Sequence, residues 1–159
     1  MKTKTDLLLE LWLEARTRFS NQLENLTEQD LQKKLGDSPN SVGFLIRHIG
    51  EVELLFAKNV FGDSTIKVTA KTVIDKHDTG EWTDLEALKS YVSKSFEKLK
   101  SIVEKQTDED WGSSISTKEF GSKTKAEAFG RIISHTAYHA GLLLINMVGR
   151  NYEINRFCN

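Results

Sequence analysis

Three of the four histidines have the residue type and spacing that a metal site needs. His135 and His139 are four residues apart, so on a helix their imidazoles project from one face, one turn apart. Two imidazoles at this spacing can share one ion. With His48, which lies in an earlier helical segment, they form a predicted three-histidine metal site.

The apolar pattern around these histidines indicates that they face the core of a helix bundle. Positions that are alternately three and four residues apart face inward in a helix bundle. One segment has this spacing at Leu45, His48, Val52, Leu55 and Asn59, and the other has it at Ile132, His135, His139, Leu142 and Asn146. Burying an imidazole without a partner costs about 1–3 kcal/mol. A shared ligand therefore explains three inward histidines better than a purely structural role, which is the alternative.

Three imidazole ligands leave at least one coordination position free, as in catalytic sites, whereas structural zinc sites are closed by four protein ligands. Glu51 or Glu53 could close the site, but both lie off the inward spacing, and we expect them to be solvated. A hydrogen bond from a ligand imidazole to Glu51 is the alternative for that residue. His77 lies in a loop, and we expect it to face water.

Composition and motifs exclude several other functions. The chain has 159 residues, with Lys+Arg 22 against Asp+Glu 23 and a net charge of -1, so no nucleic-acid or anionic-membrane partner is expected. There is no P-loop, G-x-G-x-x-G, G-x-S-x-G or C-x-x-C motif, and no glutamate between His135 and His139 as in the H-E-x-x-H proteases.

The compartment is expected to be the cytoplasm. The N-terminus shows no export signal, and no segment has the uncharged length of a membrane span. Cys158 is the one cysteine, so no internal disulfide can form, which fits a reducing compartment.

Helical periodicity predicts four long helices, over about residues 5–23, 41–61, 83–103 and 125–148. Gly62 and Gly149 are placed to end the second and fourth helices, and Thr83 with Glu86 predicts a capping box for the third. Shorter elements are also expected: capped turns beginning at Thr27 and Thr107, the first ending at Gly36; extended structure at Ile66, Val68 and Val73 within the long 62–82 segment; and a hairpin over 115–123 turning at Gly121.

The two halves of the chain resemble each other. Residues 26–31 are similar to 106–111, and residues 45–48 to 132–135. His48 and His135 each lie 14 residues before a glycine stop. A true repeat predicts a pseudo-two-fold axis with His48 and His135 facing each other, whereas chance similarity between amphipathic helices is the alternative.

Residues 41–51 around His48, residues 132–141 with the H-x-x-x-H pair, and the closing 147–149 together resemble the DinB/YfiT-like superfamily of metal-binding bundles. The resemblance implies an all-α four-helix bundle with up-down-down-up topology and a long crossover between the second and third helices. It also implies a single domain over 1–159, a divalent metal, nickel or zinc, on His48, His135 and His139, and a homodimer.

The resemblance also implies thiol-dependent chemistry. Some members are S-transferases that use bacillithiol, mycothiol or glutathione, and one is a maleylpyruvate isomerase. We therefore expect a metal-dependent enzyme, such as an S-transferase, that acts on a small-molecule substrate with a low-molecular-weight thiol as co-substrate. The alternatives are a metal-dependent hydrolase and a non-catalytic metal-stabilised or ligand-binding stress-related module. Ala140 departs from the family pattern, because relatives often carry an arginine there.

Overall fold

Four long helices form the framework of the computed structural model, which describes residues 1–149. They are α1 (Lys4–Glu24), α2 (Val42–Asn59), α4 (Leu85–Val103) and α5 (Lys125–Val148). The smaller elements are the 3-10 turns η1 (Glu28–Asp30) and η2 (Asp110–Gly112), the short helix α3 (Lys71–Asp75), and the hairpin strands β1 (Ser114–Thr117) and β2 (Gly121–Thr124). The expected all-α bundle is confirmed, with the predicted hairpin as a small addition. Cys158 lies outside the described residues.

Each long helix begins at a side chain that caps its first turn. Thr3, Ser41 and Thr124 accept hydrogen bonds from the backbone N–H groups three residues later, which are otherwise unpaired. The capping box predicted at Thr83 is wrong, because Asp84 is the N-cap and its carboxylate accepts from the Ala87 N–H at 2.9 Å. Asp is as good an N-cap as Thr, so α4 begins one residue later than the Thr83 pattern indicates.

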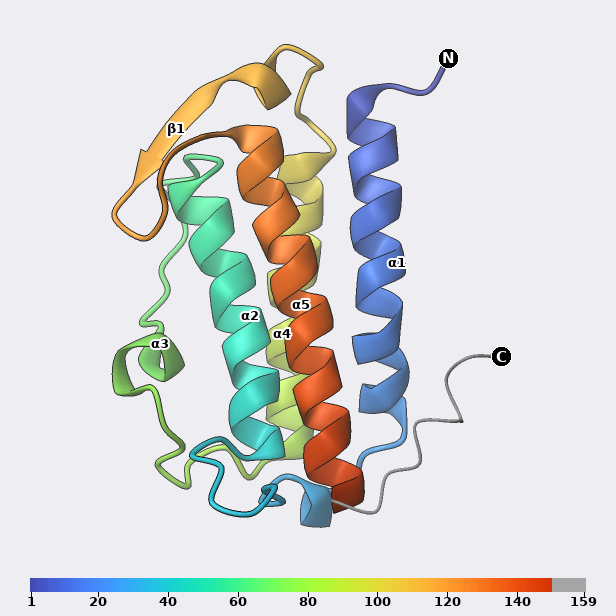
Figure 1. The fold of residues 1–159 in the computed structure, drawn as a ribbon, viewed down its shortest axis with the longest axis vertical. Helices are drawn as coiled ribbons and strands as arrows, with labels where there is room; N and C mark the ends of the chain where they lie inside the picture. Colours follow the sequence, from blue (N-terminus) through green and yellow to red (C-terminus); the bar gives the residue numbers. More distant parts are fainter. Residues whose placement is uncertain (150–159) are drawn as a thin grey trace.

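The helices run up-down-down-up, as expected. In Figure 1, α1 and α5 run down the view, whereas α2 and α4 run up. Because α2 and α4 are parallel, the chain between them must return along the length of the bundle. The 60–84 crossover does this and carries α3 on its way.

The packing agrees with a two-fold relation between the halves. The most extensive helix pairs are α2 with α4 and α5 with α1, while α2 also packs on α5. If α1 is exchanged with α4 and α2 with α5, the same helix pairs are obtained. The capped turns repeat in the same way: the N–H and hydroxyl of Thr27 bind Asp30, and those of Thr107 bind Asp110, all at 2.8–2.9 Å. The first turn ends at Asp30, however, and not at Gly36.

The crossover differs from its prediction. No strand forms at Ile66, Val68 or Val73, and Val73 belongs to α3. This helix is bounded by two residues with left-handed backbones, Ala70 at φ 51 and Lys76 at φ 59. Neither is a glycine, so this conformation is held by the surroundings of the segment.

Glu51 and Glu53 are fully buried, and the expectation that they are solvated is wrong. Glu53 accepts hydrogen bonds from Arg16 Nε at 2.9 Å and from the Ser95 hydroxyl at 2.6 Å. Glu51 accepts from Arg47 Nε at 2.8 Å and from both the N–H and hydroxyl of Thr72. Buried carboxylates are tolerated because each is paired and hydrogen-bonded.

None of the helices in residues 1–149 combines the length and apolar character needed to cross a membrane.

Candidate metal centre

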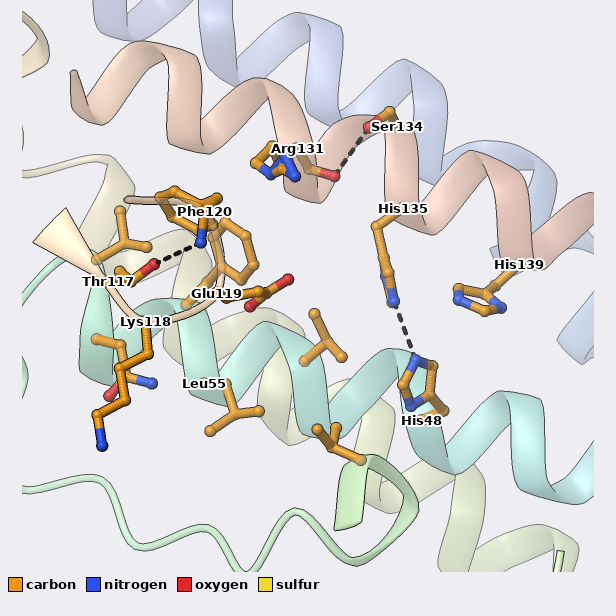
Figure 2. Close-up of a pocket in the computed structure, with 15 residues that line it drawn as sticks. His48, Leu55, Thr117, Lys118, Glu119, Phe120, Arg131, Ser134, His135 and His139 are labelled. Carbon is orange, nitrogen blue, oxygen red and sulfur yellow. Dashed lines mark hydrogen bonds between the residues drawn. The ribbon is translucent and has the colours of Figure 1, made fainter. Parts of the chain in front are cut away.

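The three predicted histidines converge at the middle of the bundle. His48 comes from α2, while His135 and His139 come from successive turns of α5, and their side chains point toward one another in Figure 2. The Nε2 atoms of His48 and His135 are 3.1 Å apart, and one ring nitrogen of each of the three lies within 4.8 Å of the others. All three are half-buried. The face-to-face placement of His48 and His135 is the one that the repeat predicted.

His77 takes no part in this cluster. It is exposed in the crossover, with Nδ1 2.6 Å from the Asp75 carbonyl oxygen.

Thr72 determines which nitrogen of His48 carries its proton. The Thr72 hydroxyl donates to Glu51 Oε2 at 2.6 Å, because a carboxylate only accepts. Its oxygen must therefore accept from Nδ1 of His48, 3.0 Å away. The proton on Nδ1 leaves a lone pair on Nε2, which faces the other two histidines, as a metal ligand requires.

Glu51 therefore supports His48 through Thr72, and not by the direct imidazole–carboxylate contact considered from the sequence. The sequence could not predict the hydrogen bond between Thr72 and Glu51, because Thr72 lies 21 residues later, in the crossover.

The other two imidazoles each have a ring nitrogen without a hydrogen-bond partner. Nδ1 of His135 and Nδ1 of His139 are buried and have no hydrogen-bond partner among the described residues. Buried polar atoms are normally paired, and an unpaired one in a native structure needs an explanation such as an ion or a water. Binding an ion through one ring nitrogen would compensate for burying these rings.

The environment keeps the cluster neutral. Burial lowers the pKa of His48. Burial, with the imidazoles of His139 and His48, lowers the pKa of His135 to about 3, and burial with His48 lowers the pKa of His139 to about 4. Neutral imidazole is the form that binds metals. The residues therefore fit a divalent cation with nitrogen preference, such as zinc or nickel.

The histidines form one end of a cavity of about 590 Å³. Residues of α2 line one side of it, including Val52, Leu55 and Asn59. Arg131 and Ser134 of α5, together with residues 117–120 of the hairpin turn, line the other (Figure 2). The inward spacing that singled out the histidines also identified the α2 residues. The hairpin residues gave no such signal, because a two-stranded turn can be placed against a cavity only in three dimensions.

Asn146, the other asparagine on the inward spacing, lies away from the cavity. Its side chain accepts from the Leu35 N–H and donates to the Asn40 carbonyl oxygen, both at 3.0 Å. It fastens the loop before α2 to the end of α5.

The metal-ligand group of residues 1–149 contains the three histidines and no cysteine, aspartate or glutamate. All three histidines also line the cavity. Fold and site thus define a four-helix bundle with three convergent histidines at a cavity.

Comparison with known proteins agrees with that class. The model of the DinB superfamily matches residues 11–143, so the chain belongs to the DinB superfamily. No curated protein matches the sequence.

Solved structures share the fold at low identity. The mycothiol-dependent maleylpyruvate isomerase superposes with a TM-score of 0.71 at 16% identity over 90% of this chain. The chain spans only 63% of that enzyme's length. A DinB-like protein, YjoA, from Bacillus subtilis gives a TM-score of 0.65 at 21% identity, covering 89% of this chain and 90% of the other. A conserved protein from Enterococcus faecalis gives 0.68 at 17%, covering 92% and 96%.

Proposed function

We propose that the chain binds a divalent metal ion, zinc or nickel, through His48, His135 and His139, and that it is an enzyme in which this ion activates a low-molecular-weight thiol. The observation that carries the proposal is the convergence of three neutral imidazoles at the end of a cavity, with no fourth protein ligand among the described residues. Open metal positions are typical of catalytic sites.

An ion held there would lower the pKa of a bound thiol and so supply a nucleophile at neutral pH. The chain provides the rest of the arrangement. The Thr72 hydroxyl fixes the His48 ring, so that Nε2 presents its lone pair. Val52, Leu55 and Phe56 give the cavity an apolar wall on the α2 side, against which an electrophilic substrate can pack without water.

The mycothiol dependence of the isomerase with the same fold supports the choice of a thiol over water as the reacting group. Attack of the intact thiol on a small electrophile is the reaction that these features support best: the thiol loses its proton to solvent, a C–S bond forms, and a leaving group such as chloride departs. The homodimer implied by the family resemblance stays part of this proposal, and a sedimentation mass twice that of the single chain would support it.

The test is the consumption of a thiol by an electrophile such as monochlorobimane, with protein reconstituted with zinc or nickel. Bacillithiol, mycothiol and glutathione are compared as thiols. Activity with at least one of them, lost in His135→Ala and kept in the exposed control His77→Ala, is the expected result. Equal activity of wild type and His135→Ala with every thiol would overturn the enzyme proposal. Metal binding without any thiol reaction or thiol ligation would favour a non-catalytic module.

A further inference from the structure

Arg131 places a positive charge beside the histidine cluster. It lies four residues before His135 on α5, so the two side chains share a helix face and are about 6 Å apart along the axis. Both line the same cavity. A ligand that extends from the histidines along this wall of the cavity therefore reaches the turn of α5 that carries Arg131.

The guanidinium is held in place but not paired. Its Cζ lies 5.1 Å from the centre of the Phe120 ring, on the hairpin turn. It makes no ion pair and no side-chain hydrogen bond with any residue in 1–149. By contrast, Arg16 and Arg47 each bind a buried glutamate, at 2.9 and 2.8 Å.

Contact of one face of the guanidinium with Phe120 leaves the N–H groups at its edge available. These donors form the planar fork that matches a carboxylate.

The charged side chains that line the cavity have a small positive excess, which favours an anion. The cavity lining includes Arg131 and Lys118 against one carboxylate, Glu119. In Figure 2, the Lys118 amine points away from the histidines, whereas the Glu119 carboxylate projects into the cavity. Arg131 is therefore the cation best placed to meet a ligand, and Glu119 disfavours negative charge on the part of a ligand that lies beside it.

From these observations we infer that the cavity takes a thiol or substrate that presents a carboxylate, which Arg131 binds while the reacting group lies at the histidines. The inference rests on the proposed function and specifies its ligand class. The body of the ligand packs between Phe120 and the apolar α2 wall of Val52 and Leu55.

Binding of two thiols of equal chain length tests the inference without any turnover. Zinc-loaded protein is titrated calorimetrically with 3-mercaptopropionate, which carries a carboxylate, and with 3-mercapto-1-propanol, which is neutral. The wild type should bind the carboxylate about tenfold more tightly, the range for a hydrogen bond to a charged group. Arg131→Gln should abolish most of this preference while leaving the dissociation constant of the neutral thiol unchanged.

Two further variants sharpen the result. Glu119→Gln should strengthen binding of 3-mercaptopropionate, because it removes the repelling carboxylate. Arg18→Gln is the matched control, since Arg18 is an exposed arginine that lines a separate groove with residues of α1 and α5, and it should change neither constant. Equal binding of the two thiols by the wild type, or a preference that survives in Arg131→Gln, would overturn the inference alone. Binding of zinc but of neither thiol would overturn the inference together with the proposed thiol chemistry.

Discussion

The Thr72 hydroxyl lies 3.0 Å from Nδ1 of His48, on the side of the ring opposite the nitrogen that faces His135. Thr72 belongs to α3, so the long crossover between α2 and α4 reaches the histidine cluster at this point. Its hydroxyl and N–H both bind the buried carboxylate of Glu51. The crossover thereby sets the tautomer and orientation of one predicted ligand.

Thr72→Val should weaken metal binding because it removes the acceptor for Nδ1 of His48 while keeping the shape of the side chain. Loss of such a supporting partner typically reduces metal affinity 10–100-fold. Competition with a chelating dye measures the affinity. Thr72→Ser, which restores the hydroxyl, should return it to within a few-fold of the wild type. An unchanged affinity in Thr72→Val would show that the hydroxyl does not orient His48.

The metal-free protein should lose stability as the pH falls from about 6.5 to 4. The pKa of His135 is lowered to about 3 and that of His139 to about 4, both from 6.5. The unfolded chain therefore binds more protons across this window, and stability rises with pH. Each pH unit between the folded and unfolded pKa values costs up to about 1.4 kcal/mol per histidine.

Urea unfolding in the presence of a chelator, at several pH values, measures this dependence. His135→Leu should show a flatter dependence, because one of the titrating histidines is gone. A variant curve parallel to that of the wild type would mean that His135 is not the group responsible.

Gly43→Ala should destabilise the fold where the crossover meets α2. A Cβ at this position would lie 2.1 Å from the backbone oxygen of Trp82, which cannot rotate away. Overpacking of this kind costs about 1–3 kcal/mol in the free energy of unfolding. Gly130→Ala is the matched control, because a Cβ there meets nothing within 4 Å and α5 gains a better helix former. Urea midpoints should therefore fall for Gly43→Ala and rise slightly for Gly130→Ala.

The long helices could be predicted from sequence because their signal is local. The apolar spacing over residues 125–148 predicts the extent of α5, and Gly149, which has φ 70, ends it as expected. The helix α3 could not be predicted, because Ala70, its N-cap, has a left-handed backbone and makes no side-chain capping bond.

The histidine cluster could also be predicted, since spacing alone places the three rings on inward faces of two helices. The buried carboxylates could not. Glu53 is stabilised by Arg16 and Ser95, which are 37 and 42 residues away in the chain. When only its own helix is considered, a glutamate is expected to be solvated, because unpaired glutamates are almost never fully buried. Arg131 and Glu119 were missed for a similar reason, because their cavity forms only when the hairpin packs beside α5.

Metal content per chain decides whether the three histidines are ligands. Plasma mass spectrometry is applied to protein purified without an affinity tag, for the wild type, His48→Ala, His135→Ala, His139→Ala and the exposed control His77→Ala. About one equivalent of zinc or nickel is expected in the wild type and in His77→Ala, with loss in each of the other three variants. A wild type that holds no metal even after reconstitution with zinc and nickel, or a full equivalent retained in the three alanine variants, would contradict the three-histidine site.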